Sequence, residues 1–449
     1  MRRWFADFAL VQGTWQRDVC IDVENGVIAR VCSDAPRDDA DYLGRYVLPG
    51  MPNLHSHAFQ RALAGRTERF ERPDDSFWTW REAMYREAAM VDPDRLFVIA
   101  RLLYADLLEM GYTRVCEFHY VHHQANGNHY APVGAMSDAL IAAAQEAGIG
   151  LTLLPTLYQR GGFRDEPLAP RQQRFAFALD DYLHLLDTLA ARDEGFRFGA
   201  AIHSLRAVDA ETIAAVCASP VLRARPIHIH ISEQRRELEE CLVVHGRYPI
   251  DRLIDISPVD MRFCLVHATH ASHDELAAIV RCGAVVGLCP TTEANLGDGL
   301  FEIGDYCRLG GRFGIGSDSH VGLDPREELR WLEYQARLAS GQRNELGSAA
   351  KPDVAANLWS DAVLGGAQAC GASAGGIAVG ADADFIELDP DDPAFAPVAD
   401  QEVLAAWLFA SARRPIKTVT VSGKRVIQEG RHSQRDVFES AFRDAVRSV

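Results

Sequence analysis

The chain has 449 residues, of which 48% are hydrophobic and 24% are charged, a composition that is ordinary for a globular protein and excludes a largely disordered chain. Its 63 acidic and 46 basic residues give a formal net charge of -17, which disfavours nucleic acid and anionic membranes as partners. No apolar run is long enough to predict a membrane span, and ten cysteines without a CxxC pair favour free thiols and a cytoplasmic location.

The N-terminal segment is rich in short predicted strands. Apolar and β-branched stretches lie at 8–11, 19–23 and 27–31. Asn25-Gly26 between the last two predicts a tight hairpin turn.

From about residue 49 to about residue 371, short apolar runs alternate with longer helical patterns, which is typical of a parallel sheet built from βα units. One predicted helix is clearly bounded, because Asp92 can cap it, Pro93 suits its first turn, and Gly111 follows as a stop signal. Eight candidate strands predict an α/β fold of the closed (β/α)8 TIM-barrel type. They lie at 46–57, 113–119, 151–157, 198–204, 226–232, 263–267, 285–289 and 313–318.

Strand patterns return near the C-terminal end. They lie at 385–388, 418–421 and 425–427, and a Ser422-Gly423 turn separates the last two. We therefore expect residues 1–48 and 372–449 to form one small discontinuous β-sandwich domain, completed by a C-terminal helix, beside a barrel domain of residues 49–371.

Residues with metal-binding side chains end several of the barrel strands. His55 and His57 close the first strand, and because side chains two apart on a strand share a face, both imidazoles can reach one ion. Alone, this pair would fit exposed loop histidines equally well. However, His230 closes the fifth strand, and His267 and Asp318 close the sixth and the eighth. The chemistry of such barrels gathers at the C-terminal strand ends, so the sequence predicts a metal site there.

With these residues in place, the sequence resembles the amidohydrolase superfamily over nearly its whole length, including the segment 48–53 before the first histidine pair. The resemblance implies that His55, His57, His230 and Asp318 are metal ligands and that His267 is catalytic.

One departure from the superfamily concerns lysine. Binuclear members bridge two metals with a carboxylated lysine from a barrel strand, whereas this chain has only Lys351, Lys417 and Lys424. We see no glutamate on the corresponding strand end that would replace it. The sequence therefore favours one divalent ion per subunit. Three imidazoles and one carboxylate suit Zn2+ best, with Fe2+ and Mn2+ as alternatives.

The spacing from His230 to Glu233 resembles the His-x-x-Glu element of mononuclear deaminases, which attack an sp2 carbon bearing nitrogen with metal-activated water. By that resemblance, we expect His267 and Asp318 to orient the water and take its proton. Glu233 would pass a proton to the imino nitrogen and to the leaving ammonia. For Glu233 alone, a solvated loop carboxylate is the alternative interpretation.

Four stretches resemble the formimidoylglutamate deiminases within this superfamily, at 54–61, 77–81, 117–123 and 201–206. The resemblance implies hydrolysis of N-formimino-L-glutamate to N-formyl-L-glutamate and ammonia, a reaction of histidine degradation. A small dicarboxylate bound by an acidic protein needs fixed cations, and a guanidinium can donate two parallel hydrogen bonds to a carboxylate. Arg81 and Arg206 are the candidates, and Gln60, Tyr120 and His203 would complete the polar shell.

Several alternatives stay open. Arg81 can instead stack on Trp78 or Trp80, and His203 can be a barrel histidine with a structural role. The aromatic and charged segment 60–87 can be a lid or a contact with a second subunit. The whole chain can be a related deaminase of guanine or another purine, or a catalytically silent barrel that only binds. By resemblance alone we expect a homodimer.

Overall fold

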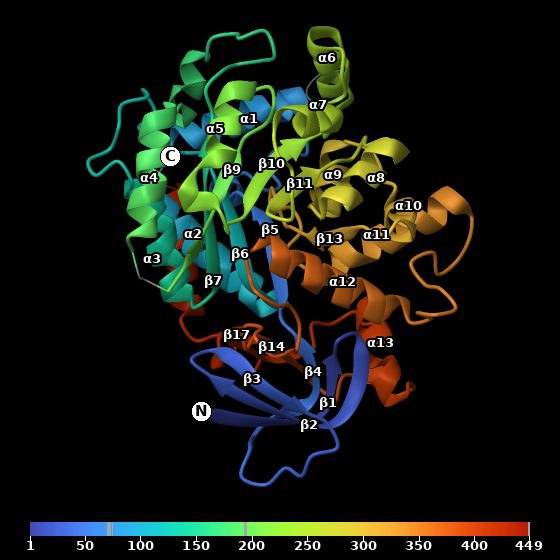
Figure 1. Cartoon of the computed structure of the whole chain (residues 1–449). Coiled ribbons are helices and arrows are strands. Elements are labelled where there is room, and N and C mark those ends of the chain that lie inside the picture. Colours follow the sequence, from blue (N-terminus) through green and yellow to red (C-terminus); the bar gives the residue numbers. More distant parts are fainter. Residues whose placement is uncertain (70–72, 74, 193–194, 448–449) are drawn as a thin grey trace.

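The structure is a computed structural model of the whole chain, and it describes all residues except 70–72, 74, 193–194 and 448–449. A parallel barrel surrounded by helices occupies the upper part of Figure 1, and a separate sheet built from both chain ends lies below it. This arrangement confirms the predicted α/β barrel and the small domain built from both chain ends, which the structure forms as one sheet.

Eight parallel strands close the barrel in chain order. The fourth strand consists of two short segments, β8 and β9, which both pair with β7. The strands are β5 (Met51–Ser56), β6 (Tyr112–His119), β7 (Gly150–Leu157), β8 (Arg197–Phe198), β9 (Ala200–Ile202), β10 (Ile227–Ile231), β11 (Phe263–His267), β12 (Val285–Leu288) and β13 (Arg312–Ile315). Each of them overlaps a predicted strand.

Helices pack around the barrel and cover its outer face (Figure 1). They are α1 (Phe77–Ala89), α2 (Pro93–Met110), α3 (Ala135–Ala147), α4 (Leu179–Ala190), α5 (Ala210–Ala218), α6 (Arg235–His245), α7 (Pro249–Ile256), α8 (His273–Cys282), α9 (Pro290–Leu296), α10 (Ile303–Arg308), α11 (Pro325–Ser340) and α12 (Val354–Ala369). The 3-10 turns η1 (Ala58–Ala62), η2 (Pro170–Phe175) and η3 (Pro220–Leu222) lie between them.

Helix α2 begins and ends as its sequence predicts. The Asp92 carboxylate accepts a hydrogen bond from the amide of Arg95, Pro93 occupies the first turn, and Gly111 adopts a left-handed backbone with φ 98°. A glycine takes that conformation without the steric cost that a Cβ atom would bring. The helix buries its apolar face, including Ile99, against the barrel core.

The predicted first strand, 46–57, is wrong as one element, because the structure divides it at Gly50. Residues before the glycine form β4 (Asp41–Pro49) in the lower sheet, and residues after it form β5 in the barrel. A Cβ atom at Gly50 would lie 2.3 Å from the Thr113 side chain, so only glycine fits where the chain passes between the two sheets.

The lower sheet has eight strands in the order β17-β16-β15-β14-β4-β1-β2-β3. The N-terminal part supplies β1 (Arg2–Val11), β2 (Thr14–Glu24), β3 (Val27–Cys32) and β4, and the C-terminal part supplies β14 (Phe385–Leu388), β15 (Ile416–Val421), β16 (Lys424–Gln428) and β17 (Arg431–His432). The predicted turns at Asn25-Gly26 and Ser422-Gly423 have positive φ at both residues, as tight hairpins require. Remaining elements are η4 (Pro393–Phe395), η5 (Asp400–Glu402), α13 (Val403–Phe409) and the C-terminal helix α14 (Arg435–Arg447).

Ionic contacts join the two parts of the molecule. Asp382, which precedes β14, accepts hydrogen bonds from Arg114 on β6 at 3.0 Å and from Arg197 on β8 at 2.7 Å. These cations outweigh the effect of burial and lower the pKa of the Asp382 carboxyl. We propose the predicted limits of 1–48, 49–371 and 372–449 as the domain boundaries.

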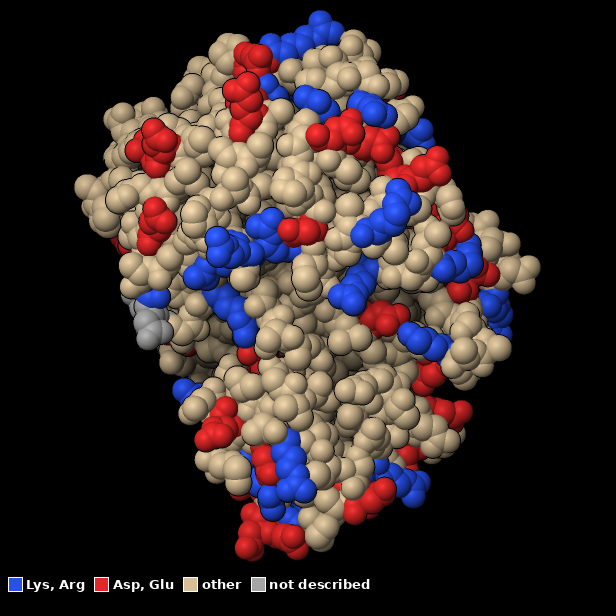
Figure 2. All heavy atoms as spheres, viewed as in Figure 1, with Lys and Arg blue, Asp and Glu red and all other residues tan. Residues whose placement is uncertain are grey.

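Two surface properties bear on partners. Lys and Arg are scattered among Asp and Glu over the face shown in Figure 2, which displays no broad basic patch. Among the described residues, the structure has no helix that is both long enough and apolar enough to span a membrane.

Candidate metal centre and adjoining pocket

The histidines and the aspartate predicted to bind a metal lie together at the C-terminal rim of the barrel. Asp318 Oδ1 is 3.4 Å from both His55 Nε2 and His57 Nε2, and His230 Nε2 is 3.1 Å from His55 Nε2. The backbone ties Asp318 to the first strand, because its amide donates to the His55 carbonyl and its carbonyl accepts from the His57 amide. All four side chains are buried.

Backbone hydrogen bonds fix the direction of two of these rings. The Nδ1 atom of His57 donates to the carbonyl of Phe118 at 2.8 Å, and the Nδ1 atom of His230 donates to the carbonyl of His203 at 3.0 Å. Each Nε2 atom therefore carries a lone pair directed at Asp318 and His55, which is the tautomer that a metal-binding histidine needs.

The donor set fits a divalent cation. Burial, reinforced by the neighbouring histidines, holds the pKa of His55 and His230 well below its usual range, so both rings are neutral. The Nε2 atoms of His55 and His230 lie 3.1 Å apart, which is close enough for one cation to accept a lone pair from each ring. His55, His57 and Asp318 offer ligand atoms within 4.8 Å of one another, and so do His55, His230 and His267.

Three of these strand ends adopt a backbone conformation that non-glycine residues rarely take. The φ angle is 70° at His267, 43° at Asp318 and 53° at Ser232, which follows β10. Such strain is typical of positions where a side chain must be aimed into a site.

His267 lies between carboxylates. Its Nε2 atom is 3.7 Å from Glu233 Oε1 and 3.9 Å from Asp318 Oδ2, and its Nδ1 atom is 3.2 Å from Glu293 Oε1. Burial opposes protonation of the ring, but the three carboxylates outweigh it and raise the pKa of His267 to about 10. Glu293 was not predicted. It lies on α9, and its Oε1 atom also accepts the backbone N–H of Cys289 at 2.9 Å.

Glu233 is buried beside this cluster, with 6% of its surface exposed, which excludes a solvated loop carboxylate. Burial raises the pKa of its carboxyl to about 7. The amide of Glu233 donates to the carboxylate of Glu237 on α6 at 3.2 Å, so a second buried acid holds the peptide that carries Glu233.

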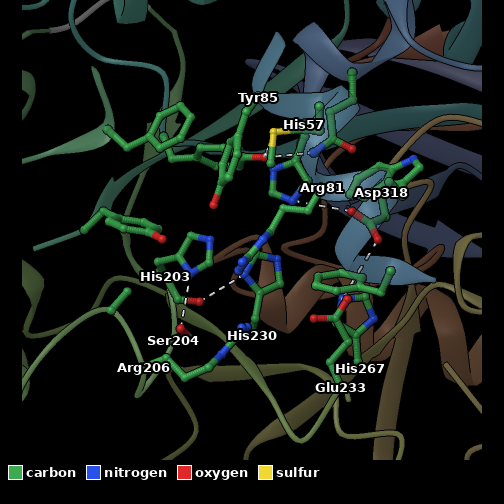
Figure 3. A pocket seen from close by; sticks show the side chains of 18 of the residues that line it. His57, Arg81, Tyr85, His203, Ser204, Arg206, His230, Glu233, His267 and Asp318 are labelled. Carbon is green, nitrogen blue, oxygen red and sulfur yellow. Dashed lines mark hydrogen bonds and ion pairs between the residues drawn. The ribbon is translucent and has the colours of Figure 1, made fainter. Parts of the chain in front are cut away.

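A pocket with about 720 Å3 of empty space opens beside the cluster, and all five residues predicted to bind substrate line it. Figure 3 shows Arg81, His203 and Arg206 directed into this space next to His230. Gln60 donates to the Tyr120 hydroxyl at 2.8 Å. The predicted residues are Gln60, Arg81, Tyr120, His203 and Arg206.

The two guanidiniums are the cations of interest in this pocket. Within the described part of the chain, neither Arg81 nor Arg206 makes a hydrogen bond or an ion pair, and the Nε atom of each is buried without a partner. Arg160 also lines the pocket, but it donates to the carbonyls of Leu205 and Val208. Arg81 also lies 4.5 Å from the centre of the Trp78 ring, so the expected stacking occurs in addition to its place in the pocket.

Part of segment 60–87 covers the pocket. Phe77, Trp80 and Met84 on α1 line it together with Gln60, so this helix closes one side of the site. Residues 70–72 and 74 of the segment lie outside the described residues. Tyr85 on α1 and Tyr158 directly after β7 also line the pocket, and neither was predicted to bind substrate. Tyr158 has a strand-end signal, because it follows the predicted strand 151–157, whereas Tyr85 lies within a helix and has no such signal.

Comparisons with known proteins agree over the whole chain. The model of the amidohydrolase family matches residues 46–426. The formimidoylglutamate deiminase of Pseudomonas aeruginosa is 48% identical over 441 residues, which cover 98% of this chain and 97% of that protein. An amidohydrolase structure from Brucella melitensis has a TM-score of 0.94 at 40% identity, covering 100% of this chain and 99% of that one. The structure of an adenosine deaminase from Xanthomonas campestris with bound zinc has the same fold, with a TM-score of 0.81 at 23% identity, covering 100% and 98%.

Proposed function

The chain belongs to the amidohydrolase family, and from that premise we propose that it hydrolyses N-formimino-L-glutamate to N-formyl-L-glutamate and ammonia. The observation that carries the proposal is a pair of guanidiniums, on the half-buried Arg81 and the buried Arg206, that lack hydrogen-bond partners in the described residues and lie beside a cluster of histidines and acids. The 48% identity to a formimidoylglutamate deiminase over nearly both whole chains supports it.

We propose that His55, His57, His230 and Asp318 hold one divalent ion, with Zn2+ as the preferred metal. Imidazole nitrogens with one carboxylate are a donor set that zinc favours, although Fe2+ and Mn2+ accept the same ligands. When bound, the ion supplies Lewis acidity that lowers the pKa of water toward neutrality.

The protein's own groups are placed to orient the attacking water and to move its protons. Asp318 accepts a proton from the water at its carboxylate. His267, whose Nε2 atom lies 3.9 Å from Asp318 and 3.7 Å from Glu233, orients the water together with Asp318 and helps to take its proton. Glu233, whose pKa lies near 7, delivers its proton to the imino nitrogen. The water loses two protons, the first to Asp318 and the second from the hydroxyl group formed by its attack. One of them restores the carboxyl group of Glu233, and the other is delivered through Glu233 to the nitrogen that departs as ammonia.

The remaining pocket residues bind and orient the substrate. Arg206 and Arg81 bind the carboxylates of the substrate, since a guanidinium donates two parallel hydrogen bonds to such a group. Gln60, Tyr120 and His203 complete the polar wall around the formimino end. The aromatic side chains of α1 exclude bulk water from the reaction.

Two further properties belong to the proposal. The ten cysteines are free in the structure, which supports a cytoplasmic location. We also propose a homodimer, which sedimentation equilibrium at micromolar protein would test, because a monomer mass at that concentration would contradict it.

Ammonia release from N-formimino-L-glutamate, compared with release from guanine and adenosine under the same conditions, tests the function. We expect turnover of the formimino compound alone, because a neutral purine has no carboxylate for Arg81 or Arg206. Preferential turnover of a purine would contradict the proposal, and an absence of turnover on all three would favour a silent barrel.

A further inference from the structure

Behind the pocket, the side-chain amide of one buried glutamine donates hydrogen bonds to two tyrosines of the pocket wall. Gln172 lies on η2, Tyr85 on α1 and Tyr158 directly after β7. Both tyrosines line the pocket, whereas Gln172 does not. All three are buried, with exposed fractions of 7% for Gln172, 5% for Tyr85 and 6% for Tyr158. These residues have no part in the proton transfers proposed above.

The orientation of the Gln172 amide is fixed. Its Oε1 atom accepts the backbone N–H of Ala169 at 2.8 Å, so its Nε2 atom must be the side that faces the tyrosines. Nε2 donates to the Tyr158 oxygen at 2.8 Å and to the Tyr85 oxygen at 3.2 Å. Each phenol oxygen therefore accepts one hydrogen bond from behind the pocket wall, and each still has an O–H to donate.

At least one of these two protons is free for a ligand. Burial raises the pKa of the Tyr158 hydroxyl, which keeps it protonated at neutral pH. Even when one phenol donates to the other, the second O–H has no acceptor among the described residues. Buried donors without an acceptor are costly, and an anion in the pocket would satisfy them.

The position of the phenols indicates which part of a substrate they meet. The ring of His203 lies 5.2 Å from that of His230 and 4.5 Å from that of Tyr158, centre to centre. The His203 ring therefore lies between that of Tyr158 and that of His230, and Tyr158 is farther from the histidine cluster than His203 is. Figure 3 shows the Tyr85 hydroxyl directed into the space bordered by Arg81, His203 and Arg206. An anion in this place is attracted by both arginines.

We propose that Tyr85 and Tyr158 form a subsite for the substrate carboxylate farther from the reacting carbon, and that Gln172 is the positioning residue that turns their hydroxyls toward it. The subsite selects dicarboxylates over monocarboxylates. The inference rests on the proposed function for the identity of the substrate, but binding of a dicarboxylate tests it without turnover.

The test measures the dissociation constants of two N-formyl amino acids by calorimetry. N-formyl-L-glutamate has the distal carboxylate, and N-formyl-L-2-aminobutanoate lacks it. For the double variant Tyr85→Phe/Tyr158→Phe, we expect binding of the glutamate compound to weaken at least about tenfold, as for lost hydrogen bonds to a charged group. Binding of the aminobutanoate compound should stay within about twofold of the unmodified protein.

Tyr182→Phe is the matched control, because the buried Tyr182 hydroxyl donates to the Pro155 carbonyl at 2.9 Å and lies outside the pocket lining. It should change neither constant. Gln172→Leu should weaken binding of the glutamate compound selectively, with both tyrosines still present. Equal losses on both ligands, no loss in the double Phe variant, or failure of the unmodified protein to bind N-formyl-L-glutamate would overturn the subsite. An unaffected Gln172→Leu variant would overturn the positioning role. Absence of turnover with normal selective binding would contradict the proposed function and leave the subsite supported.

Discussion

Replacing Arg206 with Met should raise KM for N-formimino-L-glutamate strongly and leave kcat less affected. The Arg206 side chain is 9% exposed, and its guanidinium has no hydrogen-bond partner in the described residues. It is therefore free to make both bonds of a bidentate carboxylate pair. Two such bonds at roughly 1.5 kcal/mol each give about 3 kcal/mol, or about 150-fold in affinity.

The same change should also affect stability, because Arg206 is a counter-charge for buried acids. Glu237 and then Glu233 raise the pKa of Arg206 against the effect of its burial. Without the cation, Glu237 is a buried acid whose Oε1 atom has no partner, which is destabilising. The double variant Arg206→Met/Glu237→Gln should recover thermal stability but not affinity. This separates the loss of substrate binding from the loss of structure.

Steady-state ammonia release over a range of substrate concentrations measures both parameters. Arg236→Met is the control. Arg236 lies 4.6 Å from the centre of the Trp78 ring, from which Arg206 lies 5.8 Å, but Arg236 does not line the pocket. Its KM should stay within about twofold of the unmodified protein, because a stacking contact at the surface contributes little. A KM for Arg206→Met within threefold of the unmodified protein would refute the carboxylate role.

Three further changes test other parts of the structure. Glu233→Gln should retain the full metal content and lower kcat at least about 100-fold, the usual loss for a general acid, and retained turnover would remove Glu233 from the mechanism. Gly50→Ala should lower the melting temperature without changing KM, since its Cβ would clash with the Thr113 side chain, and an unchanged melting temperature would contradict that contact. Burial raises the pKa of Asp384 to about 6, above its unfolded value, so ionisation costs stability as the pH rises through 6. The melting temperature of Asp384→Asn minus that of the unmodified protein should therefore be larger at pH 8 than at pH 4.5. An equal difference at both pH values would contradict this.

The sequence predicts the barrel and the histidine cluster well because both follow local rules. Alternation along a strand places His55 and His57 on one face, and parallel strands bring their C-terminal ends to one rim. Helix α2 follows equally local capping signals at Asp92 and Gly111. Its limits could be predicted without any knowledge of the packing.

The features that the sequence does not predict depend on tertiary contacts. The apolar run 46–57 reads as one strand, but it crosses from one sheet to another at Gly50, where the Thr113 side chain leaves no room for a Cβ atom. The hydrogen bond from Gln172 to Tyr85 joins residues that are 87 positions apart in the sequence, so no local pattern predicts it. Glu293 has a local signal, since it follows the end of the seventh barrel strand, but its pairing with His267 needs the closed barrel.

Metal content and ammonia release, measured on one preparation of the purified protein, test the proposed activity most directly. We expect about one divalent ion per chain, release of ammonia from N-formimino-L-glutamate, loss of that release on chelation, and its return when Zn2+ is added. Full activity in protein freed of metal, or no ammonia from protein that contains one ion per chain, would contradict the proposed chemistry.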